Sequence, residues 1–357
     1  MGGQEKPFAS FLRKVAARKE LDVSEAEQAF RLIMQGAVSD IELAAFLTAL
    51  QMRGETVEEL SGAVQAVRQS MQALQNVPDD TVDVCGTGGD GLGTLNVSTA
   101  TAFVLAGLGV PVAKHGGRAL SSRAGATDVL EALGIPADAD HARQEKRLRQ
   151  ENLAFLAAPF HHPAMRVAAP VRKQLGFRTL FNLLGPLCNP ARVRRQLVGV
   201  FDEVWCRPVA RVLGELGAVS AWVVHGHTDE GGIDELTLAG PTHNDVWENG
   251  EIISFDLTPE MAGLPHYGIA ALKGGDPICN AQRMRALFAG ETGCYRDTVL
   301  LNAAVGLHVA GRGNLLESGR LSVPALRRNV AEAARSLDEG LARKALIRAQ
   351  TGVSAQD

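Results

Sequence analysis

From about residue 80 onward the chain alternates short β-rich runs with helical stretches, and this alternation constrains the fold more than any other feature. The β-rich runs are 81–85, 110–113, 153–157, 197–201 and 219–224, and the helical stretches include 98–108, 124–134, 165–175 and 204–216. Such alternation is typical of a mostly parallel sheet flanked by helices. We therefore predict an α/β domain over residues 80–357, with ligand sites at the strand ends.

The first 75 residues carry only helical signals. Three capping boxes follow one another: Ser24 with Glu27, Ser39 with Glu42, and Thr56 with Glu59. Apolar residues recur at helical spacing between these signals, which predicts a small helical domain over residues 1–75, completed by a helical segment near 170–195. Short helices with broad apolar stripes must pack against a larger domain, a second subunit, or both. The chain from Val323 predicts one more amphipathic helix.

Composition limits the class of partner. The chain has 357 residues, 21% of them charged, and a net charge of -4, which argues against nucleic acid or an anionic membrane as the main partner. No apolar run approaches the roughly 20 residues that a membrane helix needs. The N-terminus lacks the apolar core of a secretory signal, and the five cysteines are scattered, as in a reducing compartment. We therefore expect a cytoplasmic protein.

A glycine-rich segment, Gly86-Thr-Gly-Gly-Asp-Gly91, follows the first β-rich run. Its glycines allow the backbone to turn so that several N–H groups converge on an anion. The next segment, Thr94-Leu-Asn-Val-Ser-Thr99, precedes an apolar helix and offers hydroxyl groups and a helix N-terminus to a second phosphate. The two segments together predict a site for a diphosphate-bearing ligand.

Three other interpretations of this segment are possible. Gly86, Gly88 and Gly91 satisfy the dinucleotide pattern G-x-G-x-x-G, but residues 92–96 separate them from the helix, and the next β-rich run ends at Lys114 where an acid is needed. A dehydrogenase is therefore disfavoured. The Gly-Lys-Ser/Thr signature of ATPases is absent. The third interpretation is a plain strand–turn–helix connection that binds no ligand, and the five glycines within residues 86–93 argue against it.

A second polar segment, Lys114-His-Gly-Gly-Arg-Ala-Leu-Ser-Ser122, is predicted to form a loop. Two cations and two hydroxyl groups on a glycine-bearing turn suit a phosphate or diphosphate. A solvated surface loop is the alternative. The segment lies one helix after the glycine-rich segment, which predicts that both lie at the same edge of the sheet.

Taken in order, the motifs resemble those of the anthranilate phosphoribosyltransferase family of tryptophan biosynthesis. The resemblance covers nearly the whole chain and rests on residues 86–90, 96–99, 114–116, 126–131, 162–165, 169–172, 178–186, 189–190, 234–236, 274–277 and 297–302. It implies a helical domain beside an α/β domain and a homodimer formed through the helices. It also implies a reaction in which the amino group of anthranilate displaces pyrophosphate from phosphoribosyl pyrophosphate (PRPP).

The resemblance further implies which residues form the site. The substrate-binding residues would be Gly86, Gly89, Asp90, Thr94, Asn96, Val97, Ser98, Thr99, Lys114, His115, Gly116, Gly117, Arg118, Ser121, Ser122, Ala126 and Arg172, the last facing the carboxylate of anthranilate. Two Mg²⁺ ions would bind Ser98, Asp234 and Glu235. Magnesium prefers oxygen ligands and stabilises a departing pyrophosphate. The Asp-Glu dipeptide alone proves nothing, because it recurs at 202–203, 229–230 and 338–339.

The sequence departs from the family pattern at two main places, and Ala126 stands where some relatives have Ser. Gly117 stands where the family has an Asn that contacts the acceptor, which predicts weaker acceptor binding by one hydrogen bond, about 0.5–1.5 kcal/mol. The connection from His225 to Asp234 is longer than in the family. A related phosphoribosyltransferase with another acceptor, a pyrimidine-nucleoside phosphorylase, and a non-catalytic nucleic-acid-binding relative therefore remain alternatives. No general base is evident from the sequence.

Overall fold

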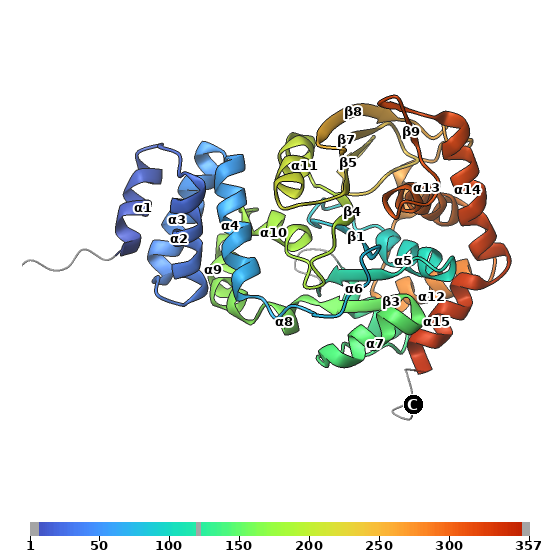
Figure 1. Cartoon of the computed structure of the whole chain (residues 1–357), viewed down its shortest axis with the longest axis horizontal. Helices are drawn as coiled ribbons and strands as arrows, with labels where there is room; N and C mark the ends of the chain where they lie inside the picture. The colour runs from blue at the N-terminus through green and yellow to red at the C-terminus, as the bar shows by residue number, and fades with distance from the viewer. Residues whose placement is uncertain (1–6, 119–122, 352–357) are drawn as a thin grey trace, which may run out of the picture. The chain divides into compact units, whose positions relative to one another are not determined.

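The computed structural model describes residues 7–118 and 123–351 (Figure 1). The chain divides into two compact units, which interleave along the sequence. The first unit contains Met1–Ala73 and Ala158–Pro190, and the second contains Leu74–Ala157 and Ala191–Asp357. Each unit has its own apolar core and is described separately.

The first unit is entirely helical. Its elements are α1 (Pro7–Ala16), α2 (Val23–Met34), α3 (Asp40–Arg53), α4 (Val57–Ser70), α8 (Ala158–His161), the 3₁₀ helix η1 (Pro163–Ala168), α9 (Ala169–Leu175) and α10 (Phe181–Leu187). Phenylalanines from four helices meet in its core: the ring centroids of Phe8 and Phe46, Phe30 and Phe46, and Phe30 and Phe181 lie 5.1, 6.1 and 5.6 Å apart. Aromatic contacts of this kind add to the burial of apolar area.

Two of the predicted capping boxes are confirmed, and one is wrong. Ser39 and Thr56 cap α3 and α4, each with the Glu three residues later. Ser24 lies inside the first turn of α2, and the cap is Asp22 with Glu25. The Asp22 carboxylate accepts from Glu25 N at 2.9 Å. Both D-x-x-E and S-x-x-E match the capping pattern here, and the helix begins at the earlier one, next to Leu21, whose N–H donates to the buried Glu59 Oε1 at 2.9 Å.

The second unit is built on one sheet, as predicted. Its strands are β1 (Val82–Gly86), β2 (Val112–Gly116), β3 (Leu153–Ala157), β4 (Arg195–Gly199), β5 (Ser220–Thr228), β6 (Gly231–Ile233), β7 (Thr242–Glu248) and β8 (Glu251–Leu257). The order is β3-β2-β1-β4-β5-β7-β8, with β6 beside β5. The five strands β3, β2, β1, β4 and β5 are parallel to one another. Strands β6 and β7 pair antiparallel with β5, and β8 pairs antiparallel with β7. The predicted α/β class with a mostly parallel sheet is confirmed.

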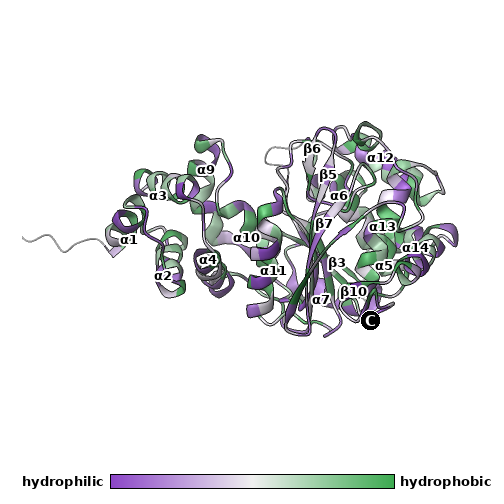
Figure 2. Ribbon diagram, turned by 90° about the horizontal axis from the view of Figure 1, so that it is seen from above, coloured by the Kyte–Doolittle hydropathy of each residue, from purple (hydrophilic) through white to green (hydrophobic). Residues whose placement is uncertain are grey.

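Helices flank this sheet. They are α5 (Val97–Gly107), α6 (Ala126–Ala132), α7 (His141–Glu151), η2 (Glu203–Trp205), α11 (Cys206–Glu215), η3 (Ile269–Leu272), α12 (Pro277–Phe288), α13 (Cys294–Val309), α14 (Val323–Asp338) and α15 (Leu341–Thr351), with a small ribbon of β9 (Leu316–Glu317) and β10 (Arg320–Leu321). Helices α5 and α13 are apolar over most of their surface and are almost wholly buried in the core (Figure 2). A helix that is apolar all round belongs inside the protein.

The single C-terminal helix predicted from Val323 is wrong. The structure has two helices, α14 and α15, which are separated at Gly340. Gly340 has a φ of 69°, and its N–H donates to Leu337 O at 3.0 Å. Glycine adopts this left-handed conformation at little cost, and it commonly ends a helix. Among the residues that the structure describes, no helix is both long and apolar enough to cross a membrane.

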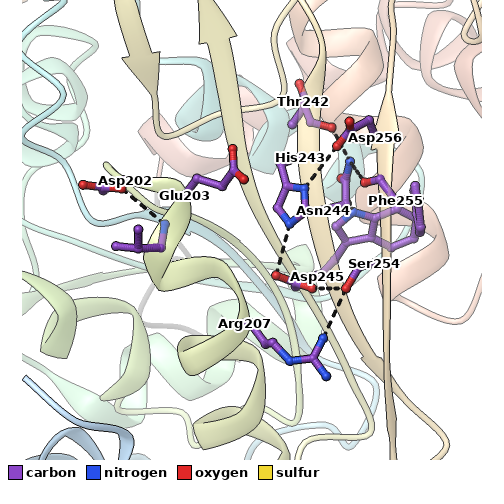
Figure 3. A network of polar contacts seen from close by, with 12 residues as sticks. Asp202, Glu203, Arg207, Thr242, His243, Asn244, Asp245, Ser254, Phe255 and Asp256 are labelled. Atoms are coloured by element: carbon purple, nitrogen blue, oxygen red, sulfur yellow. Dashed lines mark hydrogen bonds and ion pairs between the residues drawn. The ribbon is translucent and has the colours of Figure 1, made fainter.

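A polar network joins β7, β8 and α11 (Figure 3). The ring of His243 lies between two carboxylates, with Nδ1 3.1 Å from Asp256 Oδ1 and Nε2 3.2 Å from Asp245 Oδ2. Ser254 donates to Asp245, and Arg207 donates to Ser254 Oγ at 3.4 Å. Partial burial alone would lower the pKa of His243, but the hydrogen bonds to Asp256 and Asp245 outweigh it, and the pKa is raised.

We expect His243→Gln to destabilise the fold more in mild acid than in mild alkali. Because the folded-state pKa is raised, the contribution of the charged ring is complete below the unfolded pKa of about 6.5 and is lost as pH rises through the folded value. The pairs are partly exposed, so the expected difference is about 0.5–1 kcal/mol. Urea unfolding at pH values of about 5.5 and about 9 measures it, and equal destabilisation at both would contradict it.

Candidate active site

The polar segments singled out in the sequence meet at the carboxyl edge of the sheet. Strands β1, β2 and β4 are parallel neighbours, and they end at Gly86, Gly116 and Gly199. Asp234 and Glu235 directly follow β6, which pairs with the far end of β5. The carboxyl edge of an open α/β sheet is where ligands bind in such folds.

The segment 86–93 forms the turn predicted from its glycines, and we call it the phosphate loop. Gly88, Gly89, Gly91 and Gly93 have φ values of 66°, 80°, 79° and 62°, in the left-handed region that other residues rarely adopt. Thr87 fixes the start of the loop, because its N–H donates to Gly199 O at 2.9 Å and its Oγ1 accepts from Phe201 N at 3.0 Å. Residues 94–96 then lead into α5, whose N-cap is Asn96.

Asp234 and Glu235, which we call the acid pair, accept hydrogen bonds from backbone N–H groups of the phosphate loop and of the start of α5. Gly88 N donates to Asp234 Oδ2 at 2.6 Å, and Ser98 N donates to Glu235 Oε1 at 3.1 Å. The approach is close enough to require glycine at two strand ends. A Cβ on Gly86 would overlap the Asp234 carboxylate, and a Cβ on Gly199 would overlap the Asp234 carbonyl oxygen.

These acids share a crowded negative environment. Burial is the largest cause that raises the pKa of Asp234 well above its usual value, followed by the charges of Asp90 and Glu235. Burial also raises the pKa of Glu235 to about 7, although the charge of Lys114 and the hydrogen bond from Ser98 N oppose the rise. Burial and like-charge crowding favour protonation, so a cation placed here would stabilise the ionised forms.

Lys114 provides a buried positive charge beside the acids. Its Nζ donates to Val84 O at 2.8 Å and to Ser98 Oγ at 3.1 Å. The sequence predicted that Lys114 and His115 lie on a loop, and this is wrong, because both are buried in β2. The Lys114 side chain reaches the edge from inside the sheet, and it thereby lies against β1 and the first turn of α5.

The remaining predicted residues lie in varied surroundings. His115 N donates to Asp83 Oδ1 at 3.2 Å, Gly117 O accepts from Thr127 N at 3.2 Å, and a Cβ on Gly116 would lie 3.1 Å from Ala126 Cβ. Arg118 pairs with Asp128 and Glu131 at 2.9 and 2.5 Å. Ser121 and Ser122 lie outside the described residues.

Three further predicted residues lie at or just before the start of α5, and a fourth lies in the helical unit. Val97 and Thr99 are buried in the first turn of α5. Thr94 forms an isolated antiparallel bridge with Lys273. Arg172 belongs to the first unit, where its guanidinium carbon lies 5.2 Å from the centroid of the Phe181 ring, and burial lowers its pKa.

A pocket of about 330 Å³, including its open mouth, adjoins the second segment. Its walls come from Gly116, the start of α6 at Ala126, residues 135–137 and the end of β3, and among the described residues that line it Lys114 is the only charged one. The walls are mostly apolar, so the pocket suits a flat or apolar group more than a second phosphate.

Three side chains that the sequence analysis did not identify contact the phosphate loop and Asn96. Lys273 Nζ donates to Leu92 O at 3.0 Å, Asn280 Nδ2 donates to Asn96 Oδ1 at 3.0 Å, and Tyr295 Oη donates to Asn96 O at 3.2 Å. Near these side chains the sequence offers only residues 274–277 and 297–302, which belong to the family resemblance and imply no particular role.

The donor set of this edge fits magnesium. Within residues 7–118 and 123–351, no three His, Cys, Asp or Glu side chains are arranged to hold a metal by themselves. Mg²⁺ in enzymes usually takes one or two carboxylates together with substrate phosphates, and hard oxygen ligands are what Asp234, Glu235 and Ser98 present. Burial of two neighbouring carboxylates raises their pKa values and does not stabilise the fold, whereas a bound divalent cation would stabilise both in their ionised forms.

Comparisons with known proteins agree with this geometry. Residues 9–71 match the glycosyl transferase family, helical bundle domain, and residues 78–343 match the glycosyl transferase family, a/b domain. The anthranilate phosphoribosyltransferase of Gluconobacter oxydans is 64% identical over 339 residues, covering 95% of this chain and 93% of that protein.

Solved structures similar to this chain include anthranilate phosphoribosyltransferases. The crystal structure of anthranilate phosphoribosyltransferase from Thermus thermophilus has 42% identity and a TM-score of 0.86, covering 96% of this chain and 98% of that one. The Saccharomyces cerevisiae enzyme in complex with PRPP and Mg has 27% identity and a TM-score of 0.82, covering 96% and 97%. These matches confirm the resemblance found in the sequence, and the chain belongs to the anthranilate phosphoribosyltransferase family.

Proposed function

We propose that this protein transfers the 5-phosphoribosyl group of PRPP to the amino group of anthranilate. The bond from ribose C1 to the pyrophosphate oxygen breaks, a bond from C1 to nitrogen forms, and the amine loses one proton. The products are N-(5-phosphoribosyl)anthranilate and pyrophosphate. The observation that carries the proposal is the contact of the phosphate loop with the acid pair, through Gly88 N and Asp234 Oδ2 at 2.6 Å.

The phosphate loop and the start of α5 provide the groups that bind phosphates. Backbone N–H groups of the glycine turn and the positive end of α5 would face a phosphate, and Lys114 Nζ lies 3.1 Å from Ser98 Oγ at the start of that helix. Gly86, Gly89, Asp90, Thr94, Asn96, Ser98 and Thr99 would contact PRPP on this basis. Binding the phosphate groups of PRPP orients ribose C1 toward the acceptor, and positioning of this kind contributes strongly to rate.

Asp234, Glu235 and Ser98 would hold magnesium, and we propose two ions per subunit. Bound there, magnesium neutralises the charge that develops on the departing pyrophosphate. The Gly88 and Ser98 N–H groups orient the two carboxylates before any ligand binds. The solved structure of the Saccharomyces cerevisiae relative contains PRPP and Mg, which supports the use of magnesium with this substrate.

Arg172 would bind the carboxylate of anthranilate. Its guanidinium remains charged under all conditions of interest, and a bidentate pair with a carboxylate is geometrically specific. The amino group of anthranilate is uncharged at neutral pH, so it can attack ribose C1 without first losing a proton to a general base. Gly117 removes one polar contact to the acceptor relative to the family pattern, and we expect weaker acceptor binding without loss of the reaction.

Anthranilate fluorescence tests the function. We expect its fluorescence to decrease only when the protein, PRPP and Mg²⁺ are all present, with one pyrophosphate released per anthranilate consumed. Omission of any one component is the control. Folded protein that leaves anthranilate unchanged while cleaving a pyrimidine nucleoside with inorganic phosphate would contradict the assignment.

We propose that the protein forms a homodimer through the helical unit and acts in the cytoplasm. Ile41 and Met52 lie eleven residues apart on α3, about three helical turns, so they share one face, and they are 83% and 72% exposed. Large apolar residues on one exposed helix face are typical of an interface. The described cysteines are all free thiols, which suits a reducing compartment.

Met52→Arg is expected to convert the dimer to a monomer, because a charge would be buried at the α3 interface. Light scattering after size-exclusion chromatography measures the mass. Val204 in η2 is 68% exposed and provides a matched control, since Val204→Arg adds the same charge outside the helical unit. A wild-type monomer, or a Met52→Arg dimer as stable as wild type, would refute the interface.

A further inference from the structure

The phosphate loop and the start of α5 are braced from behind by a segment about 180 residues later in the chain. Leu95 N donates to Leu272 O at 2.9 Å, and Gly274 N donates to Gly93 O at 2.8 Å, on either side of the bridge between Thr94 and Lys273. A Cβ on Gly274 would lie 2.8 Å from Thr94 O, so the two backbones are in direct contact. The segment 272–275 therefore holds the loop, and the side chains that follow it can act on the loop.

Asn280 is the side chain of this brace that contacts a predicted substrate-binding residue. It lies in the first turns of α12 and is 2% exposed. Its Oδ1 accepts from Gly275 N at 2.8 Å, and its Nδ2 donates to Asn96 Oδ1 at 3.0 Å. Gly275 N can only donate, so it fixes which end of the Asn280 amide faces the backbone. The other end, the amino group, must then face Asn96.

The same logic fixes the amide of Asn96. Because Asn280 presents a donor, Asn96 must present its carbonyl oxygen, and its amino group then points to Ala124 O at 3.3 Å. Asn96 makes no side-chain cap on α5, although Asn is a favoured capping residue. Its amide is bonded instead to Asn280 and Ala124. Tyr295 Oη donates to Asn96 O at 3.2 Å and so holds its main chain.

We infer that Asn280 is a positioning residue for PRPP binding, acting through the orientation of the Asn96 amide. A carboxamide has two donor hydrogens and two acceptor lone pairs, so Asn96 retains one of each after its bonds to Asn280 and Ala124. With its amide fixed, Asn96 presents these groups to a sugar phosphate in one arrangement, which saves the cost of ordering it on binding. This inference rests on the proposed function, since it assumes that PRPP is the ligand at Asn96.

Asn280→Asp is the sharpest test, because it keeps the shape and the acceptor for Gly275 N but removes the donor for Asn96. Two acceptor oxygens would then face each other, and the Asn96 amide would turn over and direct its oxygen at Ala124 O. We expect the KM and the calorimetric Kd for PRPP, measured with Mg²⁺ present, to rise about fivefold to tenfold, the loss of about one hydrogen bond. The KM for anthranilate and kcat are expected to change by less than about threefold.

A double-mutant cycle separates positioning from a general loss of structure. Asn280→Ala and Asn96→Ala are each expected to weaken PRPP binding, and the double variant is expected to bind PRPP no more weakly than Asn96→Ala alone. Asn329 provides the matched control, because it is also a buried Asn, and its Nδ2 donates to two carbonyl groups, Ala304 O and Gly313 O, neither of which belongs to the phosphate loop or to α5. Asn329→Ala is expected to lower the unfolding midpoint without changing the Kd for PRPP.

The outcomes are distinguishable. Additive losses in the cycle, or Asn280→Asp binding PRPP as tightly as wild type, would overturn the inference while leaving the proposed function intact. A wild-type protein that binds no PRPP would overturn the proposed function itself. If Asn280→Ala does not fold, Asn280→Asp and Asn96→Ala still decide the matter through their Kd values.

Discussion

Replacing Asp234 by Asn and Glu235 by Gln together is expected to lower kcat/KM by at least about 10³-fold, because removal of a single transition-state charge stabiliser already costs about 10²–10³. Both replacements keep an oxygen that can accept from Gly88 N and Ser98 N, the bonds that orient the native carboxylates. The charge for magnesium is lost while the local hydrogen bonds remain. The fold is expected to be as stable as wild type or more stable, since burial raises the pKa of both acids.

The measurement has two parts, and only one of them is activity. Steady-state rates give kcat/KM, and thermal unfolding with Mg²⁺ and PRPP gives the stabilisation by ligands, which we expect the double variant to lose. Asp338 and Glu339 form the same dipeptide at the end of α14, so Asp338→Asn with Glu339→Gln is the matched control. Rates within about tenfold of wild type would rule out the acid pair as the magnesium site.

The parts of this site that are local in sequence could be predicted from it. The phosphate loop follows from its glycines, because only glycine adopts four positive φ values within six residues at little cost. The helix after it follows from capping residues and an apolar run. The mostly parallel sheet follows from the alternation of strand and helix, since consecutive parallel strands need a crossover.

The parts that depend on long-range contacts could not be predicted in the same way. Asp234-Glu235 is indistinguishable in sequence from three other Asp-Glu pairs, and what distinguishes it is a carboxylate bonded to Gly88 N, 146 residues earlier. Asn280 and Asn96 are 184 residues apart, and no local pattern relates them. Lys114 begins the polar, glycine-bearing segment that predicted a loop, and the partners that hold it inside the sheet, Val84 O and Ser98 Oγ, lie on other elements.

Gly86 and Gly199 connect the sheet to the acid pair, and they allow a second test of the site with a large effect. A Cβ on Gly86 would meet the Asp234 carboxylate, the end of a side chain that can rotate, whereas a Cβ on Gly199 would meet the Asp234 carbonyl oxygen, which belongs to the backbone. Gly199 is also paired on both sides, to Gly86 and to Val224, so neither neighbour can yield freely. The two substitutions therefore displace the same acid by different routes.

We expect Gly86→Ala to lower kcat/KM by about 100-fold, since a displacement of about 1 Å at a reacting group can cost that much, with little loss of stability. Gly199→Ala is expected to lower kcat/KM at least as far and also to cost about 1–3 kcal/mol of stability, because overpacking against a fixed backbone forces the strand to shift. Gly268 opens η3 with no atom within 4 Å of its Cβ position, so Gly268→Ala is the control and is expected to change neither quantity. Urea unfolding and steady-state rates on the three variants measure both effects. If Gly199→Ala keeps wild-type stability and turnover, the close contact between Gly199 and the Asp234 backbone does not position the acid pair.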